Sequence, residues 1–385
     1  MVIIMKRKST ALPYLALFGY GLILPILGAV LPAVAASYSL SLIRAGGLLS
    51  FHFIGFVFFI LAGGALSSRW EKQTLLSGAL LLGTSGLIMF ALTRNIFLAH
   101  LAVFMIGGSG GLIESHASAM LADARPENSA AVLNMGQAAI CIGATLTPLM
   151  IRLLWLWGLS FRLAYSVLGI LLAGLFLFSI FVEVPRTNLP KETAVHASKS
   201  FFGDRYFWLV LITIFLYAGT EAGTWGYMST FFEEKLGHES LLLLSCFFAA
   251  MAIGRLISGK LMEKFSLRSL IILFSVLSSL SAAGAAFANT MAWAVPLTFL
   301  TGICFSGLYP LIMSMGAQRS RSSTALSAIV LSGGLGTVGI PFAIVIVGGW
   351  LGNTPAQLST SAYLLAIALI YMLGRKGWDL HKNYL

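Results

Sequence analysis

Residues 96–122 read IFLAHLAVFMIGGSGGLIESHASAMLA, and this stretch decides the fold. It is apolar over more than the roughly 20 residues that a helix needs to cross a bilayer, and its only acidic residue is Glu114. A charged side chain at the centre of a bilayer costs roughly 2.5–3.5 kcal/mol on insertion scales, so a chain that keeps one there usually turns it toward a polar cavity. The stretch therefore predicts a membrane-spanning helix whose carboxylate serves a polar solute.

The composition of the whole chain agrees with a membrane protein. Hydrophobic residues make up 58% of the 385 residues and charged residues 10%, whereas soluble domains are roughly 45–50% apolar and about 25% charged. The 40 glycines suit helices that pack closely in a membrane. The net charge of +11 does not indicate nucleic-acid binding, because the basic residues lie between apolar segments and form no continuous patch.

Apolar windows of about 20 residues occur twelve times along the chain. The first six are 11–36, 43–66, 74–93, 96–122, 130–152 and 161–182, and the last six are 206–232, 240–262, 268–288, 291–315, 322–348 and 357–377. We take 11–36 as an uncleaved first span because it is longer than the core of a signal peptide. The expected fold is an all-α membrane protein of twelve helices, with six-helix bundles over 1–182 and 206–385 joined by a cytoplasmic loop over 183–205.

The basic residues and a set of repeated glycines support this organisation. Most of the 24 Lys and Arg residues fall on one side of the twelve spans, which predicts that both termini are cytoplasmic. Glycines recur at offsets of 196, 193 and 195 residues between the halves: Gly111 with Gly307, Gly143 with Gly336, and Gly64 with Gly259. Two parallel six-helix repeats are typical of transporters that bind solute near the middle of the membrane, and a non-transporting receptor is the alternative.

The chain shows no signature of an enzyme, a cofactor site or a metal site. It has no phosphate-binding loop, no nucleophile elbow and no cluster with metal-ligand spacing. Its three cysteines lie within apolar runs, and their odd number argues against a disulfide framework. Without a nucleotide site, transport is expected to be facilitated or driven by an ion.

Several stretches resemble the major facilitator superfamily. Residues 64–73, GALSSRWEKQ, resemble its signature in the loop between spans 2 and 3, with Ser68 at the place of an acid. Residues 111–114 (GLIE), 133–137 (LNMGQ) and 217–225 (YAGTEAGTW) resemble the fucose–galactose–glucose:proton symporter group. This resemblance implies proton-coupled sugar uptake with Glu114 as the proton-coupling and sugar-contacting carboxylate. Gln137 stands where that group often has His, and span 11–36 lacks the acid of its fucose member.

Spacing along two spans identifies candidate solute contacts. Tyr217, Glu221 and Trp225 are four residues apart and therefore share one helix face. A carboxylate between two aromatic rings suits a sugar, which has hydroxyl edges and apolar faces. The alternative is that the rings only pack and that Glu221 bonds to a neighbouring helix. In span 130–152, Asn134 and Gln137 begin a polar stripe that suits hydroxyl recognition, or else joins helices together.

Glu114 shares its helix face with small residues, namely Gly107, Gly110, Gly111 and Ser118. Either a void or a closely packed helix is expected there. Taking up a proton would remove the charge of Glu114 and its desolvation cost, which a coupled carrier requires; the alternative is an ion pair with Arg255. His116 lies two residues on, about 200° around the helix, and is expected to contact a helix. His52 is a candidate for lining the outer cavity.

The sequence thus predicts a secondary active transporter that imports a monosaccharide or a similar polar solute with protons by alternating access. An exporter of drugs or amphipathic metabolites and a non-transporting solute sensor remain alternatives. Sodium remains possible as the coupling ion, since carboxylate and amide oxygens also bind it. We expect a monomer in a bacterial inner membrane, with the solute, the coupling ion and the lipid bilayer as its partners.

Overall fold

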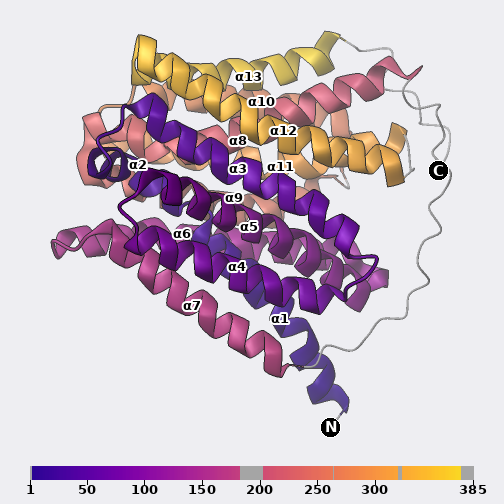
Figure 1. Cartoon of the computed structure of the whole chain (residues 1–385). Helices are drawn as coiled ribbons and strands as arrows, with labels where there is room; N and C mark the ends of the chain where they lie inside the picture. Colours follow the sequence, from indigo (N-terminus) through magenta and orange to yellow (C-terminus); the bar gives the residue numbers. More distant parts are fainter. Residues whose placement is uncertain (1, 183–202, 263, 320–322, 374–385) are drawn as a thin grey trace. The chain divides into compact units, whose positions relative to one another are not determined.

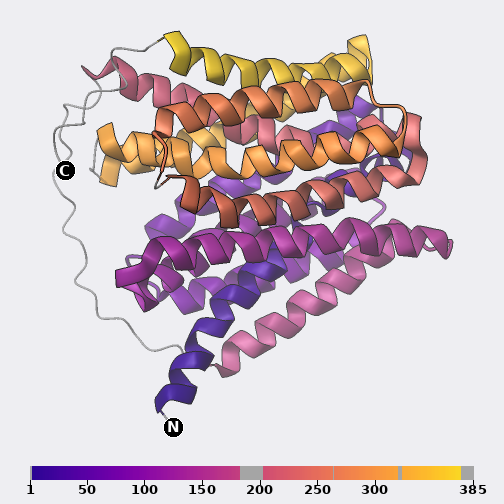
Figure 2. The same cartoon turned by 180° about the vertical axis from the view of Figure 1, so that it is seen from behind.

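The structure is a computed structural model that describes residues 2–182, 203–262, 264–319 and 323–373. Every regular element in these ranges is helical, as Figure 1 and Figure 2 show from opposite sides. The first elements are α1 Val2–Ile23, α2 Ile26–Ser37, α3 Leu42–Leu66, α4 Lys72–Leu92, α5 Ile96–Ala124, η1 Pro126–Asn128, α6 Ser129–Leu156 and α7 Phe161–Phe181. The others are α8 Arg205–Leu236, η3 Gly237–Glu239, α9 Ser240–Met262, α10 Leu267–Ala286, α11 Met291–Arg319, α12 Ser323–Leu351 and α13 Asn353–Leu373.

The predicted all-α membrane fold is confirmed. Each of the twelve expected spans coincides with one long helix or, for the first span, with the pair α1–α2. Most of the expected central loop, 183–205, lies outside the described residues. The helices are long and apolar enough to cross a membrane, and within a bilayer a helix satisfies its own backbone hydrogen bonds. The chain is therefore a multi-pass membrane protein.

Local sequence explains where several helices begin or break. Ser41, Asn95, Ser160 and Ser266 precede α3, α5, α7 and α10, and each side chain accepts a hydrogen bond from a backbone N–H of the first turn. The first span breaks into α1 and α2 at Leu24–Pro25. Proline has no N–H to donate, and its ring conflicts with the preceding turn. The first span therefore consists of two helices separated by a two-residue turn.

The chain divides into two compact units. Unit 1 comprises residues 1–190 and 225–252, and unit 2 comprises 191–224 and 253–385. The division thus falls inside α8 and α9 and differs from the expected halves, because the end of α8 and the start of α9 group with unit 1. The bundles expected over 1–182 and 206–385 stay a prediction about the internal repeat.

One close helix contact recurs in both units and supports that repeat. In unit 1, a Cβ at Gly143 on α6 would clash with the carbonyl oxygen of Phe18 on α1. In unit 2, a Cβ at Gly336 on α12 would clash with the carbonyl oxygen of Phe215 on α8. Only glycine lets two backbones approach this closely. The fifth and eleventh spans therefore pack on the first and seventh in the same way.

We expect Gly143→Ala and Gly336→Ala each to destabilise the protein by roughly 1–3 kcal/mol, because an added methyl group overpacks a tight contact. Thermal unfolding of the purified protein in detergent measures the change. Gly174→Ala on α7 is the matched control, since a Cβ there meets nothing within 4 Å. A melting temperature for Gly143→Ala equal to that of the parent protein would contradict the contact.

Candidate functional site

Glu114 and Gln137, two of the predicted site residues, contact each other directly in unit 1. Glu114 lies on α5 and Gln137 on α6, and both side chains are partly exposed. The amide nitrogen Nε2 of Gln137 donates a hydrogen bond of 3.0 Å to Oε1 of Glu114. The contact places a carboxylate and a carboxamide side by side in the apolar middle of two spans. Together they present both acceptors and donors of hydrogen bonds.

The remainder of the polar stripe on α6 divides into two parts. Asn134 is partly exposed and lies one helical turn before Gln137. Farther along, the hydroxyl of Thr145 donates to the carbonyl oxygen of Cys141 at 2.8 Å, and Cys141 is buried. Thr145 therefore satisfies its hydroxyl within its own helix. Asn134 and Gln137 are the partly exposed start of the stripe, and their contact with a solute stays a prediction.

The small residues beside Glu114 allow helices to approach closely and do not leave a void. A Cβ at Gly107 would clash with the backbone of His52, and one at Gly111 with the backbone of Phe56, both on α3. A Cβ at Gly110 would clash with the ring of Tyr20 on α1. This face was expected to hold either a void or a closely packed helix, and the structure shows closely packed helices. Tyr20 is a buried contact of α5 that sequence reasoning missed, because only the fold brings it to this helix.

His116 joins α5 to α3, which confirms the expected role of a helix-contact residue. Its Nε2 lies 3.1 Å from the hydroxyl oxygen of Ser67. Its Nδ1 lies 2.9 Å from the carbonyl oxygen of Leu112 and 3.0 Å from the hydroxyl of Ser115. His116 is buried, and these partners account for both ring nitrogens. The imidazole therefore fixes the packing of α5 beside Glu114.

The stripe Tyr217–Glu221–Trp225 lies along one face of α8. Tyr217 is fully buried in unit 2, where its hydroxyl donates to the carbonyl oxygen of Phe305 on α11 at 2.9 Å. Glu221, one turn later, is partly exposed. Trp225 belongs to unit 1 and is 5% exposed. Its ring meets the ring of Phe53 edge-on, with centroids 5.5 Å apart.

His52 on α3 is 3% exposed, and its Nε2 has no hydrogen-bond partner among the residues that the structure describes. The expectation that it lines an outer cavity stays a prediction. No group of three or more His, Cys, Asp or Glu side chains arranged to hold a metal ion occurs in the described ranges.

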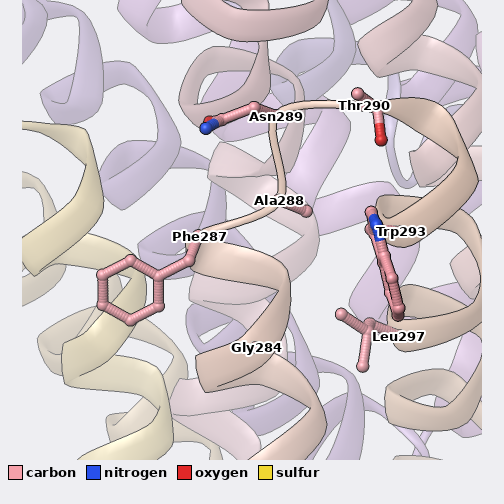
Figure 3. Close-up of a pocket in the computed structure, with 7 residues that line it drawn as sticks. All are labelled: Gly284, Phe287, Ala288, Asn289, Thr290, Trp293 and Leu297. Atoms are coloured by element: carbon pink, nitrogen blue, oxygen red, sulfur yellow. The ribbon is translucent and has the colours of Figure 1, made fainter.

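One hollow, of about 330 Å³, lies at the turn between α10 and α11 in unit 2. Figure 3 shows its lining, with Trp293 and Leu297 on one wall and the backbone from Phe287 to Thr290 on the other. Its lining contains no titratable side chain and none of the predicted site residues. Phe287 and Trp293 are largely exposed at the ends of their helices, as aromatic residues at a membrane interface commonly are.

Comparison with known proteins decides the family. The sequence model of the Major Facilitator Superfamily matches residues 14–341. The chain belongs to this family. The glucose/mannose transporter GlcP of Bacillus subtilis is 22% identical to it over 387 residues, which cover 95% of this chain and 93% of that protein. Sodium-dependent glucose transporter 1A of Mus musculus is 23% identical over 272 residues, or 59% of this chain and 61% of that protein.

Solved transporters share the fold of this one. A bacterial homologue of the human lysosomal transporter Spinster superposes with a TM-score of 0.79 at 15% identity, covering 97% of both chains. The nucleoside transporter NupG has a TM-score of 0.72 at 14% identity, covering 96% of this chain and 98% of its own. FucP in the outward conformation has a TM-score of 0.65 at 20% identity, covering 94% and 98%. The protein is a transporter of this family and not an enzyme.

We expect His116→Ala to reduce stability by roughly 1–3 kcal/mol while solute binding is retained, because it removes a buried ring together with its hydrogen bond to Ser67. Ser67→Ala and the double variant complete a cycle, and the two single losses should not add, since both remove one interaction. Thermal unfolding measures the cycle, and a binding assay of the surviving folded protein measures function. Loss of binding in stable His116→Ala protein would assign the imidazole to the site instead.

Proposed function

We propose that this transporter imports a monosaccharide or a similar hydroxylated solute together with protons. The observation that carries the proposal is the Gln137–Glu114 hydrogen bond at 3.0 Å between two part-exposed side chains of membrane-spanning helices. Relatives named as glucose and mannose transporters support a sugar as the solute class. The solute would cross the membrane inward by alternating access.

The solute would be held by polar groups with aromatic walls. Glu114, Gln137 and Asn134 supply acceptors and donors for hydroxyl groups. Glu221 adds a second carboxylate from α8, and Trp225 on the same helix face offers an apolar ring to the C–H side of a sugar. Tyr217 is proposed as part of the same wall, where its bond to Phe305 fixes the position of the ring.

Glu114 is the proposed proton carrier. Its negative charge in an apolar span costs several kcal/mol unless it is stabilised, and Gln137 supplies one stabilising donor. Binding a proton removes the charge and leaves a carboxyl group that can still accept from Gln137. The site that has bound both proton and solute can then reorient from one side of the membrane to the other at a lower desolvation cost. Movement of the solute is therefore tied to movement of the proton.

The distribution of basic residues along the sequence favours cytoplasmic termini, and we propose a bacterial inner membrane as the location. We propose a monomer, since each chain carries the whole set of site residues. Sodium is the second candidate for the coupling ion, because one relative is named as a sodium-dependent glucose transporter.

Glu114→Gln should abolish uptake driven by a proton gradient and retain solute counterflow, because the amide keeps the shape of the carboxyl group but cannot carry the proton. The measurement is uptake of labelled sugar by proteoliposomes with a pH gradient, a sodium gradient or preloaded sugar. Glu127→Gln, at an exposed position before α6, is the matched control and should transport like the parent. Gradient-driven uptake that survives in Glu114→Gln rules out this residue as the proton carrier.

The same assay separates the rival functions. If accumulation is driven by a sodium gradient and does not depend on pH, the coupling ion is sodium and not the proton. Net movement outward indicates an exporter. Saturable binding without any crossing indicates a sensor.

Trp225→Ala should weaken sugar binding by about 1–3 kcal/mol, the range expected for losing the burial of one large side chain. Trp225→Phe should recover most of the affinity, because it keeps an aromatic face. Isothermal titration against the purified protein measures both, with Trp350→Ala, which alters a largely exposed ring, as the control. Unchanged affinity in Trp225→Ala removes this ring from the site.

A further inference from the structure

The start of α8 and the end of α11 form a basic cluster in unit 2, made of Arg205, Tyr206 and Arg319. The guanidinium carbon of Arg205 lies 4.9 Å from the centroid of the Tyr206 ring, and that of Arg319 lies 4.8 Å from the same centroid. Nη2 of Arg205 also donates a hydrogen bond of 3.0 Å to the Tyr206 hydroxyl. The two positive charges therefore lie within about 10 Å of each other, which is about the Debye length at ordinary salt, so they repel.

The carboxylate of Asp204 lies beside this basic cluster and does not balance both cations. Its Oδ1 accepts a hydrogen bond of 2.8 Å from the backbone N–H of Tyr206, which caps the start of α8. Its Oδ2 lies 3.6 Å from Nη1 of Arg319. Arg205 is exposed and forms no ion pair with any residue that the structure describes. Within the described part of the chain, the basic cluster therefore keeps an excess of positive charge.

The lengths of the two helices place the basic cluster at the level of lipid headgroups. α8 has 32 residues and α11 has 29, so at 1.5 Å per residue they are roughly 44–48 Å long. The hydrocarbon core of a bilayer is only about 30 Å thick. Arg205 is the first residue of α8, and Arg319 is the last residue of α11. Both guanidinium groups are therefore expected in the polar layer, where the phosphate groups of lipids lie.

One face of α8 continues from the basic cluster with exposed apolar side chains. Arg205, Trp208 and Ile212 are spaced by three and four residues and therefore share a helix face. Trp208 and Ile212 are each 47% exposed, and tryptophan is enriched at the boundary between headgroups and hydrocarbon. Along this face a cation is followed by an aromatic ring and then by an aliphatic side chain. This order matches a phospholipid with a negative headgroup above its acyl chains.

We propose that Arg205 and Arg319 bind the phosphate of an anionic phospholipid whose acyl chain lies along Trp208 and Ile212. Guanidinium groups suit a phosphate, because their planar donors form paired, charge-assisted hydrogen bonds with its oxygens. The bound phosphate offsets the excess positive charge and links the start of α8 to the end of α11. The distribution of basic residues predicts that this end of α8 is cytoplasmic, where the leaflet carries anionic lipids.

Titration of short-chain phosphatidylglycerol into the full-length protein in detergent tests this site, with the melting temperature as the measure of binding. The lipid should raise the melting temperature of the parent protein. Arg205→Gln should weaken the apparent affinity about tenfold, because charge-assisted hydrogen bonds to the phosphate are lost. Arg94→Gln, at an exposed position between α4 and α5, is the matched control and should bind the lipid like the parent.

Unchanged affinity in Arg205→Gln, or an equal loss in Arg94→Gln, overturns the site. Phosphatidylcholine of the same chain length should stabilise the parent less, because its headgroup has no net charge, and an equal effect overturns recognition by charge. Inorganic phosphate that stabilises as much as phosphatidylglycerol overturns the assignment to a lipid. Salt at about 1 M should weaken lipid binding by the parent, and insensitivity to salt overturns the site even if a variant fails to fold. No solute or ion gradient is present, so the result does not depend on the proposed function.

Discussion

The desolvation of one carboxylate, Glu114, is the constraint on which the site depends. A bilayer offers no water to an ionised side chain, so the charge must find donors in the protein or be neutralised by a proton. Gln137 provides such a donor from the neighbouring helix, at no cost in added charge. A lysine or arginine in its place would hold the carboxylate ionised. A neutral donor instead leaves both protonation states within reach, which is the property a coupled carrier needs.

The same absence of water explains why so much of the fold follows from the sequence. Each backbone group must be bonded within its own helix, so the length of an apolar window directly measures a span. The expected windows 43–66 and 96–122 match α3 at Leu42–Leu66 and α5 at Ile96–Ala124 closely. The positions of prolines predict helix breaks less well than the apolar windows predict spans. Pro25 breaks the first span, whereas Pro13 and Pro32 lie inside helices, because the neighbouring structure decides whether a freed carbonyl finds another partner.

The candidate site was predictable only in part, since helical period gives the face of a residue but not its depth or its neighbour. The period correctly put His116 and Glu114 on different faces of α5. It also grouped Tyr217 with Glu221 and Trp225, yet Tyr217 is fully buried against α11 and Glu221 is partly exposed. The pairing of Glu114 with Gln137 depends on which helices adjoin, and nothing within either span encodes it.

The two halves share their close helix contacts but not the polar residues of the candidate site. The close contact made by Gly143 is repeated by Gly336, because backbone approach is a requirement of both halves. The offset of 196 residues that aligns Gly111 with Gly307 places Pro310 at the position of Glu114, and the offset of 193 places Val330 at that of Gln137. The second copy therefore keeps the packing and lacks the polar pair. A carboxylate in both copies would double the desolvation cost, whereas one copy suffices to bind a proton. The duplicated scaffold thus carries the proposed proton site in one copy alone, and α8 contributes its own carboxylate, Glu221, at a position that the repeat does not dictate.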